Sequence, residues 1–376
     1  MRDKLVLLAV VLGAVVYVYY TYTHFAHLQG YISDETWYPP AAYNILKYVF
    51  HYNATMYVPY PNASDIATYL NLEHPPLAKY IMALSIAALG YRELAWRLPG
   101  WILGGAAVVL AYLTGRKLLE GRSYAGLAGI LSAVLLAIDP NFWVMHGIAM
   151  LDAYAGFFSL LALYLLVSER RLESSIALGL AFATKESTFF LVFPYLYYIG
   201  ELEEKPLKRL LYAVLIPLVI YVVLSAPLIA YLGIYNWLQN GPLHMMSWDV
   251  TSGHIVGAGV ESQISTPWGW FLNIHPFYLG QNLYAKTNAA VMILWAVLTA
   301  ALWKLRDKRL AIAAAFPWSV WAGFVVVYAL GNHTLFSFYV SDFSPMVDVF
   351  VASVLVAAFA TWEEAGGARR RLKATT

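Results

Sequence analysis

Long apolar runs separated by short basic clusters dominate this sequence and restrict the folds open to it. Hydrophobic residues make up 61% of the 376 residues and charged residues only 12%, whereas a soluble domain is about 45–50% apolar and about 25% charged. At about 20 residues for each spanning helix, the chain has room for roughly ten. We therefore predict an all-α polytopic membrane protein. The absence of cysteine excludes disulfides, thiolate metal sites and cysteine nucleophiles.

The apolar runs and the polar segments between them predict one transmembrane domain over residues 1–376. Residues 24–75 and 233–287, rich in aromatic and polar residues, are expected to form two large outer loops. The first run follows a basic N-terminus and is interpreted as a signal anchor. The candidate apolar helices are 5–23, 76–90, 97–118, 123–139, 149–168, 174–200, 207–232, 289–303, 310–331 and 336–361.

The basic residues predict the orientation of the chain. Short basic loops remain on the cytoplasmic side of a membrane, so clusters such as 116–122, 205–209 and 304–309 mark the inner face, and the N-terminus is expected to be cytoplasmic. Basic residues kept apart from such clusters are functional candidates by default. Of the 24 Lys and Arg residues, those apart are Lys47, Lys79, Arg92, Arg97, Lys185 and Lys286.

Two apolar runs do not fit a simple series of crossings. Residues 76–90 are too few for a full span at 1.5 Å rise per residue, so we interpret them as a juxtamembrane or re-entrant helix, and a spanning helix is the alternative. Residues 174–200 begin and end at the inner face and carry Lys185 and Glu186 in their middle. This predicts two short helices that run to the outer side and back, lining a cavity.

Polar residues with chemical potential gather in the segments expected outside. Asp34 and Glu35 follow the first span and offer a general base near the bilayer, although a solvated turn is the simpler interpretation. Glu73 and His74 precede Pro75-Pro76, which can start a helix, and they are candidates to bind a divalent cation or a phosphate. Capping and structural roles are their alternatives.

Further candidates lie where spans begin. Arg97 is placed to reach an anionic headgroup or to snorkel at the interface. Asp152 is either functional or an N-cap. Lys185 is an ammonium in an apolar stretch and needs a partner, which is Glu186, Asp152 or a ligand anion. Trp268 and Trp270 suit either a sugar ring or an interfacial belt. Sequons for N-glycosylation occur at Asn53, Asn62 and Asn332, all in segments expected outside.

Taken together and in this order, these motifs resemble the protein O-mannosyltransferase family and related multispanning GT-C transferases. The resemblance extends over about residues 25–345. The motifs are Asp34-Glu35, His74-Pro75-Pro76-Leu77-Ala78-Lys79, Arg97-Leu98-Pro99, Leu151-Asp152, the Lys185 segment, Pro267-Trp268-Gly269-Trp270, and Phe338-Tyr339 with Pro345. The loop at 233–287 is too short for the β-trefoil domain of eukaryotic members, so a short prokaryotic member is expected, and the composition favours an archaeal source.

The resemblance implies a GT-C fold with about ten transmembrane helices and an inverting transfer at the outer membrane face. A sugar, typically mannose, would move from a polyprenyl or dolichyl phosphate to a Ser or Thr hydroxyl of a protein. Asp34 is the implied base, with Glu35 assisting. The implied donor-phosphate ligands are Lys185, Arg97 and His74, and the implied substrate-binding residues are Asp152, Trp268, Trp270, Tyr339 and Lys79.

Other partners and functions follow from the same pattern or remain open. A divalent cation is the one candidate cofactor, with Glu73 and His74 as candidate ligands. We expect no nucleic-acid partner, and a homo-oligomer is left open. A GT-C transferase with a lipid or glycan acceptor, similar to aminoarabinose transferases, is the alternative function. A secondary transporter is a remote alternative, because transporters place polar residues near the bilayer midplane and often contain repeats.

Overall fold

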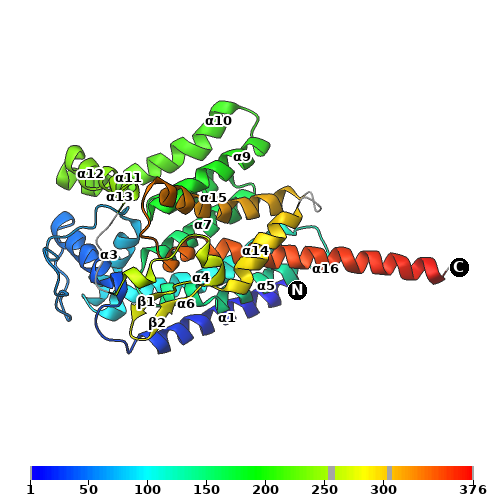
Figure 1. The fold of residues 1–376 in the computed structure, drawn as a ribbon, viewed down its shortest axis with the longest axis horizontal. Helices are drawn as coiled ribbons and strands as arrows, with labels where there is room; N and C mark the ends of the chain where they lie inside the picture. The colour runs from blue at the N-terminus through cyan, green and yellow to red at the C-terminus, as the bar shows by residue number, and fades with distance from the viewer. Residues whose placement is uncertain (1, 253–258, 303–306, 375–376) are drawn as a thin grey trace.

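The computed structural model describes residues 2–252, 259–302 and 307–374 of the chain (Figure 1). It is mainly helical, as predicted, and adds one small hairpin of β1 (Phe277–Gly280) and β2 (Leu283–Ala285), which pair antiparallel. The helices are α1 (Arg2–Phe25), α2 (Tyr38–Asn44), α3 (Leu77–Leu89), α4 (Glu93–Leu118), α5 (Ala125–Ile138), α6 (Pro140–Gly147), α7 (Leu151–Val167), α8 (Arg171–Phe182), α9 (Val192–Leu202), α10 (Pro206–Leu210), α11 (Ile216–Leu232), α12 (Ile234–Asn240), α13 (Pro242–Asp249), α14 (Ala289–Ala301), α15 (Lys308–Leu330) and α16 (Ser344–Ala374).

Several of these helices are long and apolar enough to cross a bilayer, which makes the chain an integral membrane protein. Within the described residues, 5 helices meet this condition, or up to 6 if the α5–α6 pair, bent by 61°, is one broken span. The predicted total of about ten spans is not confirmed, because α3, α7 and α14 are shorter apolar helices. The qualifying segments are Lys4–Phe25, Glu93–Leu118, Pro206–Leu232, Lys308–Leu330 and Ser344–Glu363.

The segment 174–200 folds as the predicted broken pair. Helix α8 ends at Phe182, a 3-10 turn η3 (Glu186–Leu191) follows, and α9 returns. The two ends of this pair away from the break lie together, because Arg171 at the start of α8 forms an ion pair of 3.1 Å with Glu203 just after α9. Lys185 therefore lies at the turn between the two helices. Glu186 is the acidic residue nearest to it in the sequence.

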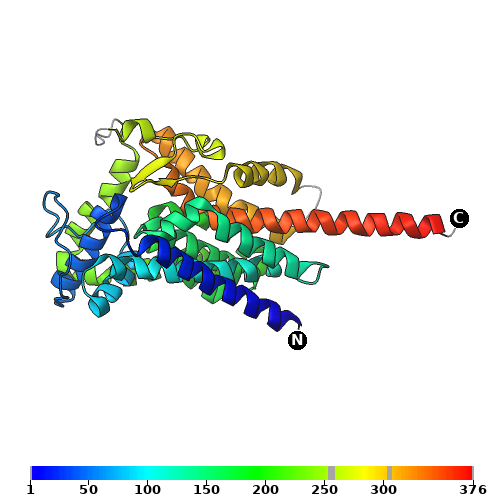
Figure 2. The same cartoon turned by 90° about the horizontal axis from the view of Figure 1, so that it is seen from below.

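The basic clusters gather at one end of the molecule and the two large loops at the other. The N-terminal end of α1 and the C-terminal end of α16 lie on the same side, opposite α3, α12 and α13 (Figures 1 and 2). At the former end Arg122 pairs with Asp307, and Arg309 donates to the Lys117 carbonyl at 3.3 Å. The structure thus brings separate basic loops to one face, although Lys304 and Arg306 lie outside the described residues.

Helix α3 is anchored at both ends to segments of the loop end. At its start the Leu77 amide donates to the Ala183 carbonyl at 2.8 Å, and just after its end the Tyr91 amide donates to the Thr55 carbonyl at 2.8 Å. Gly90, with φ of 79°, makes the turn into α4 that a residue with a Cβ would adopt only under strain. These contacts favour the juxtamembrane interpretation of residues 76–90.

A buried ion pair fixes the first outer loop to the helices. Glu35, on the 3-10 turn η1 (Ser33–Thr36), accepts two hydrogen bonds from the Arg97 guanidinium of α4, at 2.8 and 2.6 Å. Its two carboxylate oxygens also accept the backbone amides of Ile32 and Ala149, each at 3.0 Å. Both side chains are fully buried. The predicted role of Glu35 in binding the acceptor is therefore not supported, because both of its oxygens are already engaged.

Arg97 is fully engaged as well, and this corrects its predicted role in binding the donor phosphate. Its remaining N–H groups donate to the backbone carbonyls of Phe25, Leu28 and Gly30, at 3.2, 2.6 and 2.8 Å. An arginine side chain carries five N–H donors, and all of them are used inside the protein. We therefore assign Arg97 to holding the first outer loop in place.

Replacing Arg97 by alanine is expected to destabilise the protein by about 3–5 kcal/mol, because it leaves the Glu35 carboxylate buried without a cation. Thermal unfolding in detergent measures the change. Arg170→Ala is the matched control, since this arginine is 57% exposed and pairs only with nearby Glu173, and it should leave the midpoint almost unchanged. Equal midpoints for the two variants would contradict the anchoring role of Arg97.

Candidate active site

A cavity of about 500 Å³ lies where the first outer loop meets the break between α8 and α9. Helices α13 and α15 and the turn η8 (Ser337–Asp342) complete its walls. One part of the wall is polar and the other apolar. The polar part includes Asp34, Tyr38, Glu73, His74, Lys185, Glu186, Ser187, Asp249 and Asn332, and the apolar part includes Phe190, Met245, Phe324, Val327, Leu335 and Phe336.

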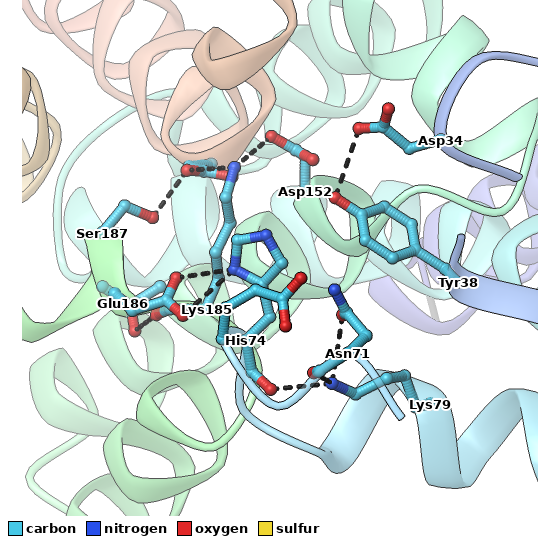
Figure 3. A network of polar contacts seen from close by, with 12 residues as sticks. Asp34, Tyr38, Asn71, His74, Lys79, Asp152, Lys185, Glu186 and Ser187 are labelled. Carbon is cyan, nitrogen blue, oxygen red and sulfur yellow. Dashed lines mark hydrogen bonds and ion pairs between the residues drawn. The ribbon is translucent and has the colours of Figure 1, made fainter. Parts of the chain in front are cut away.

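Asp34 faces this cavity while its neighbour Glu35 points away into the protein. The Tyr38 hydroxyl donates to the Asp34 carboxylate at 3.2 Å (Figure 3). Burial, and then the nearby Asp152 carboxylate, raises the pKa of Asp34 to about 6. A carboxylate with a pKa near neutrality is a stronger base than an ordinary aspartate. The geometry therefore suits Asp34 to accept a proton from a bound hydroxyl group.

Lys185 sits between two carboxylates at the bottom of the polar wall. Its ammonium pairs with Asp152 of α7, the partner predicted for it, and with Asp342 of η8 at 3.1 Å. The Tyr339 ring lies 4.3 Å from the ammonium nitrogen, and Ser187 donates to Asp342 at 2.6 Å. Asp342 is missing from the predicted site, and only the structure brings it to Lys185.

His74 and Glu186 form a second charged pair on the same wall. The His74 Nδ1 atom lies 3.0 Å from a Glu186 oxygen. Burial alone would lower the pKa of His74, but the Glu186 carboxylate outweighs it and the net shift is upward. The Nδ1 atom of His74 therefore faces Glu186, which leaves Nε2 for another group, and Figure 3 shows the contacts between the two side chains as dashed lines.

The two candidate metal ligands have separate partners. His74 pairs with Glu186, whereas the Glu73 carboxylate accepts a hydrogen bond from the Tyr69 hydroxyl. Burial raises the pKa of Glu73, but this hydrogen bond and the nearby His74 outweigh burial and lower it. In the parts of the chain that the structure describes, no group of three or more His, Cys, Asp or Glu side chains could hold a metal ion.

Two of the predicted substrate-binding residues, Lys79 and Trp270, use their donors inside the fold, and a third, Trp268, does not line the cavity. Lys79 is fully buried, and its ammonium donates to the Asn71 carbonyl, to the Asn71 side chain at 3.1 Å and to the His74 carbonyl at 2.7 Å. Trp270 is fully buried and donates to the Ser265 hydroxyl at 2.8 Å. Trp268 is 52% exposed but is not among the residues lining the cavity. Lys79, Trp268 and Trp270 therefore do not line the cavity, whereas Tyr339 and Lys185 do.

Residues of the second outer loop also line the cavity, and the motifs did not single them out. Trp248 and Asp249 come from α13, and Asn332 comes from the segment after α15. Burial, and then the Glu186 carboxylate, raises the pKa of Asp249 to about 7. Asn332 is only 3% exposed, so its sequon is not accessible, unlike those of the exposed Asn53 and Asn62. The aromatic and polar composition of the loop at 233–287 and the sequon at Asn332 were the sequence signals for these residues.

Parts of the chain are similar in sequence to known proteins. Residues 73–231 match the family profile described as dolichyl-phosphate-mannose-protein mannosyltransferase. A polyprenol-phosphate-mannose–protein mannosyltransferase of Mycobacterium tuberculosis is 30% identical over 139 residues, which are 37% of this chain and 24% of the relative. The corresponding protein of Mycolicibacterium smegmatis is 27% identical over the same length. The chain spans about a quarter of the length of these curated relatives, and their mycobacterial source lends no support to the expected archaeal one.

Two solved structures resemble the whole chain. ArnT from Cupriavidus metallidurans bound to undecaprenyl phosphate has a TM-score of 0.61 at 17% identity, covering 93% of this chain and 59% of that one. The oligosaccharyltransferase AglB from Archaeoglobus fulgidus has a TM-score of 0.53 at 14% identity, covering 98% and 52%.

The chain has the GT-C fold of these membrane proteins, as the motifs predicted. Within it, residues 73–231 are similar to the dolichyl-phosphate-mannose-protein mannosyltransferase family. The segment contains the motifs at His74, Arg97, Asp152 and Lys185, whereas Asp34-Glu35 and the Trp and Tyr motifs lie outside it.

Lys185→Met is expected to destabilise the protein by about 3–5 kcal/mol, because two buried carboxylates then lose their common cation. Adding Asp152→Asn and Asp342→Asn should recover most of this loss, since the neutral amides need no counter-ion. Thermal unfolding of the single and triple variants in detergent measures the effect. Additive losses would contradict the assignment of Lys185 as the cation shared by these aspartates.

Proposed function

We propose that this protein is a membrane glycosyltransferase that moves a sugar from a polyprenyl or dolichyl phosphate to a Ser or Thr hydroxyl of a protein. The observation that carries the proposal is one cavity with a base on one side, at Asp34, and cationic groups on another, at Lys185 and His74. The family of the matched segment supports mannose and a protein acceptor. The neighbour ArnT, which binds undecaprenyl phosphate, supports a lipid-phosphate donor.

The proposed reaction is a single displacement. The acceptor oxygen attacks the anomeric carbon of the sugar, the bond from that carbon to the phosphate oxygen breaks, and the hydroxyl proton passes to Asp34. No covalent intermediate forms on the protein, so the anomeric configuration inverts. The raised pKa of Asp34, about 6, lets it hold that proton while remaining largely ionised at neutral pH.

The leaving group is a phosphate, which is already a stable anion and needs cations rather than a strong acid. Protonated His74 has its Nε2–H group free of Glu186, and it is our first candidate phosphate ligand. Lys185 has three N–H donors. One is directed toward the carboxylate of Asp152 and one toward that of Asp342, which leaves the third for a phosphate oxygen. Glu186 and the two aspartates hold both cations in their charged forms.

The apolar part of the cavity wall suits the isoprenoid chain of the donor. Phe190 of η3 lies against Gly323 of α15, and Phe324 and Val327 of the same helix continue the apolar surface. Phe193, one turn beyond Phe190, is 65% exposed. A lipid tail that leaves the cavity between η3 and α15 would therefore stay in contact with apolar side chains.

Asp34→Asn is expected to lower kcat by a factor of about 10² or more, because the amide cannot accept the hydroxyl proton. The assay uses radiolabelled polyprenyl-phosphate mannose with a Ser/Thr-rich peptide. In the wild type kcat/KM should fall as the pH decreases through about 6, since protonation removes the base. Asp65→Asn, at an exposed position of the same loop, is the control.

The same assay separates the alternatives. Undiminished transfer by Asp34→Asn contradicts the role of Asp34 as the base. Transfer to a lipid acceptor but to no peptide would favour the aminoarabinose-transferase-like alternative. Repeating the reaction with a chelator measures whether a divalent cation, expected at Glu73 and His74, contributes. The family match leaves the transporter alternative without support.

We further propose that the cavity faces the outside and that the N-terminus is cytoplasmic. The chain lacks cysteine, so a single introduced thiol reports on one position. Asn53→Cys and Ser123→Cys replace exposed residues at the loop end and at the basic end, respectively. In sealed cells a membrane-impermeant maleimide should label only the thiol at position 53, and the reverse pattern would invert the topology. Asp152 is too deeply buried for such labelling.

A further inference from the structure

Helix α13 presents one face to the cavity. His244 and Trp248, four residues apart, line the cavity, and so do Met245 and Asp249, also four residues apart. Residues at this spacing lie on the same side of a helix. The helix contains no Lys or Arg, so this wall differs in charge from the wall that carries Lys185 and His74. An ionised Asp249 carboxylate disfavours the phosphate of a donor at this part of the wall.

Asp249 is an ionisable group that the proposed reaction does not use. Across the described residues none of the ion pairs involves it, whereas Asp152, Asp342 and Glu186 each pair with Lys185 or His74. Asn332 lies close to Asp249 and partly offsets the rise in the pKa of its carboxyl group. The side-chain oxygen of Asn332 accepts the Thr334 amide at 3.0 Å, which leaves the amide nitrogen of Asn332 for another acceptor. These two side chains form a polar pair at the cavity surface.

Trp248 stands beside this pair and is 42% exposed while lining the cavity. A sugar ring has apolar C–H faces and a rim of hydroxyl groups. An indole ring can pack against the C–H face of the sugar, and carboxylate and amide groups can form hydrogen bonds with its hydroxyl groups. Small-molecule sites usually combine aromatic side chains with a few polar groups in this way. The combination of Trp248, Asp249 and Asn332 therefore matches a neutral sugar better than it matches a phosphate, which the Asp249 carboxylate repels.

We infer that Trp248, Asp249 and Asn332 form the subsite that binds the sugar of the donor, with Trp248 against a face of the ring and Asp249 accepting hydrogen bonds from its hydroxyls. The inference rests on the proposed function and names the part of the cavity that recognises the sugar. The proposed reaction requires the anomeric carbon of a sugar bound there to lie within reach of both the phosphate ligands and the acceptor hydroxyl near Asp34.

The test compares a ligand that carries the sugar with one that lacks it. For each variant we would measure KM for polyprenyl-phosphate mannose and the inhibition constant of sugar-free polyprenyl phosphate. Asp249→Asn and Trp248→Ala should each raise KM about tenfold. The first variant loses one charge-assisted hydrogen bond to the sugar, and the second loses one aromatic contact with it. The inhibition constant should stay within about twofold, because the phosphate ligands are intact.

Tyr235→Ala and Asp65→Asn are matched controls, since both residues are exposed and lie outside the cavity lining. An unchanged KM in both α13 variants overturns the inference alone, provided that the wild type transfers sugar. An equal weakening of both ligands also overturns it, because that result indicates a general distortion of the cavity. A wild type that transfers sugar from no polyprenyl-phosphate donor overturns the proposed function and the inference together.

Discussion

The buried pair of Glu35 and Arg97 is the interaction on which the geometry of the site depends. The guanidinium joins α4 to the carbonyls that follow α1 and to the turn η1. Glu35 in turn accepts the amide of Ala149, just before α7. Since a buried arginine must satisfy its donors, this segment has few alternative positions. Fixing Glu35 inward also turns the adjacent Asp34 toward the cavity, so the pair of carboxylates divides into one anchor and one free base.

The charged groups of the cavity differ in how far their neighbours neutralise them. Lys185 and His74 are each held by carboxylates, which keep them cationic but reduce the net positive potential that they project. Among the described residues Asp34 forms no ion pair with a cation, and burial raises the pKa of its carboxyl group. A site of this kind favours binding of an anion only where a free N–H points at it, and elsewhere favours neutral hydroxyl groups. This division explains how one small cavity could accommodate both the phosphate and the sugar of a lipid-linked donor.

Sequence reasoning was most successful where local properties decide the outcome. The break at Lys185 was predictable because an ammonium cannot remain in the middle of a straight lipid-facing helix, and the structure confirms two short helices there. The shortness of 76–90 likewise indicated a helix apart from the spans. The reasoning was less successful for Arg97, Lys79 and Trp270. Each is of a residue type that often binds ligands, yet each donates its hydrogen bonds to other groups of the protein.

By itself the sequence determined the class of protein, the order of the apolar helices, the grouping of the basic loops and the residues available for chemistry. Those features follow from the length of apolar runs and the positions of charges, which are local. Only the tertiary structure decided which charged groups remain free to act. That choice depends on contacts between distant segments, such as Lys185 with Asp342, 157 residues apart, or Arg97 with Glu35, 62 residues apart. Neighbours in space decide whether a hydrogen-bond donor of the protein is already engaged. The spacing of residues along the chain does not show which neighbours those are.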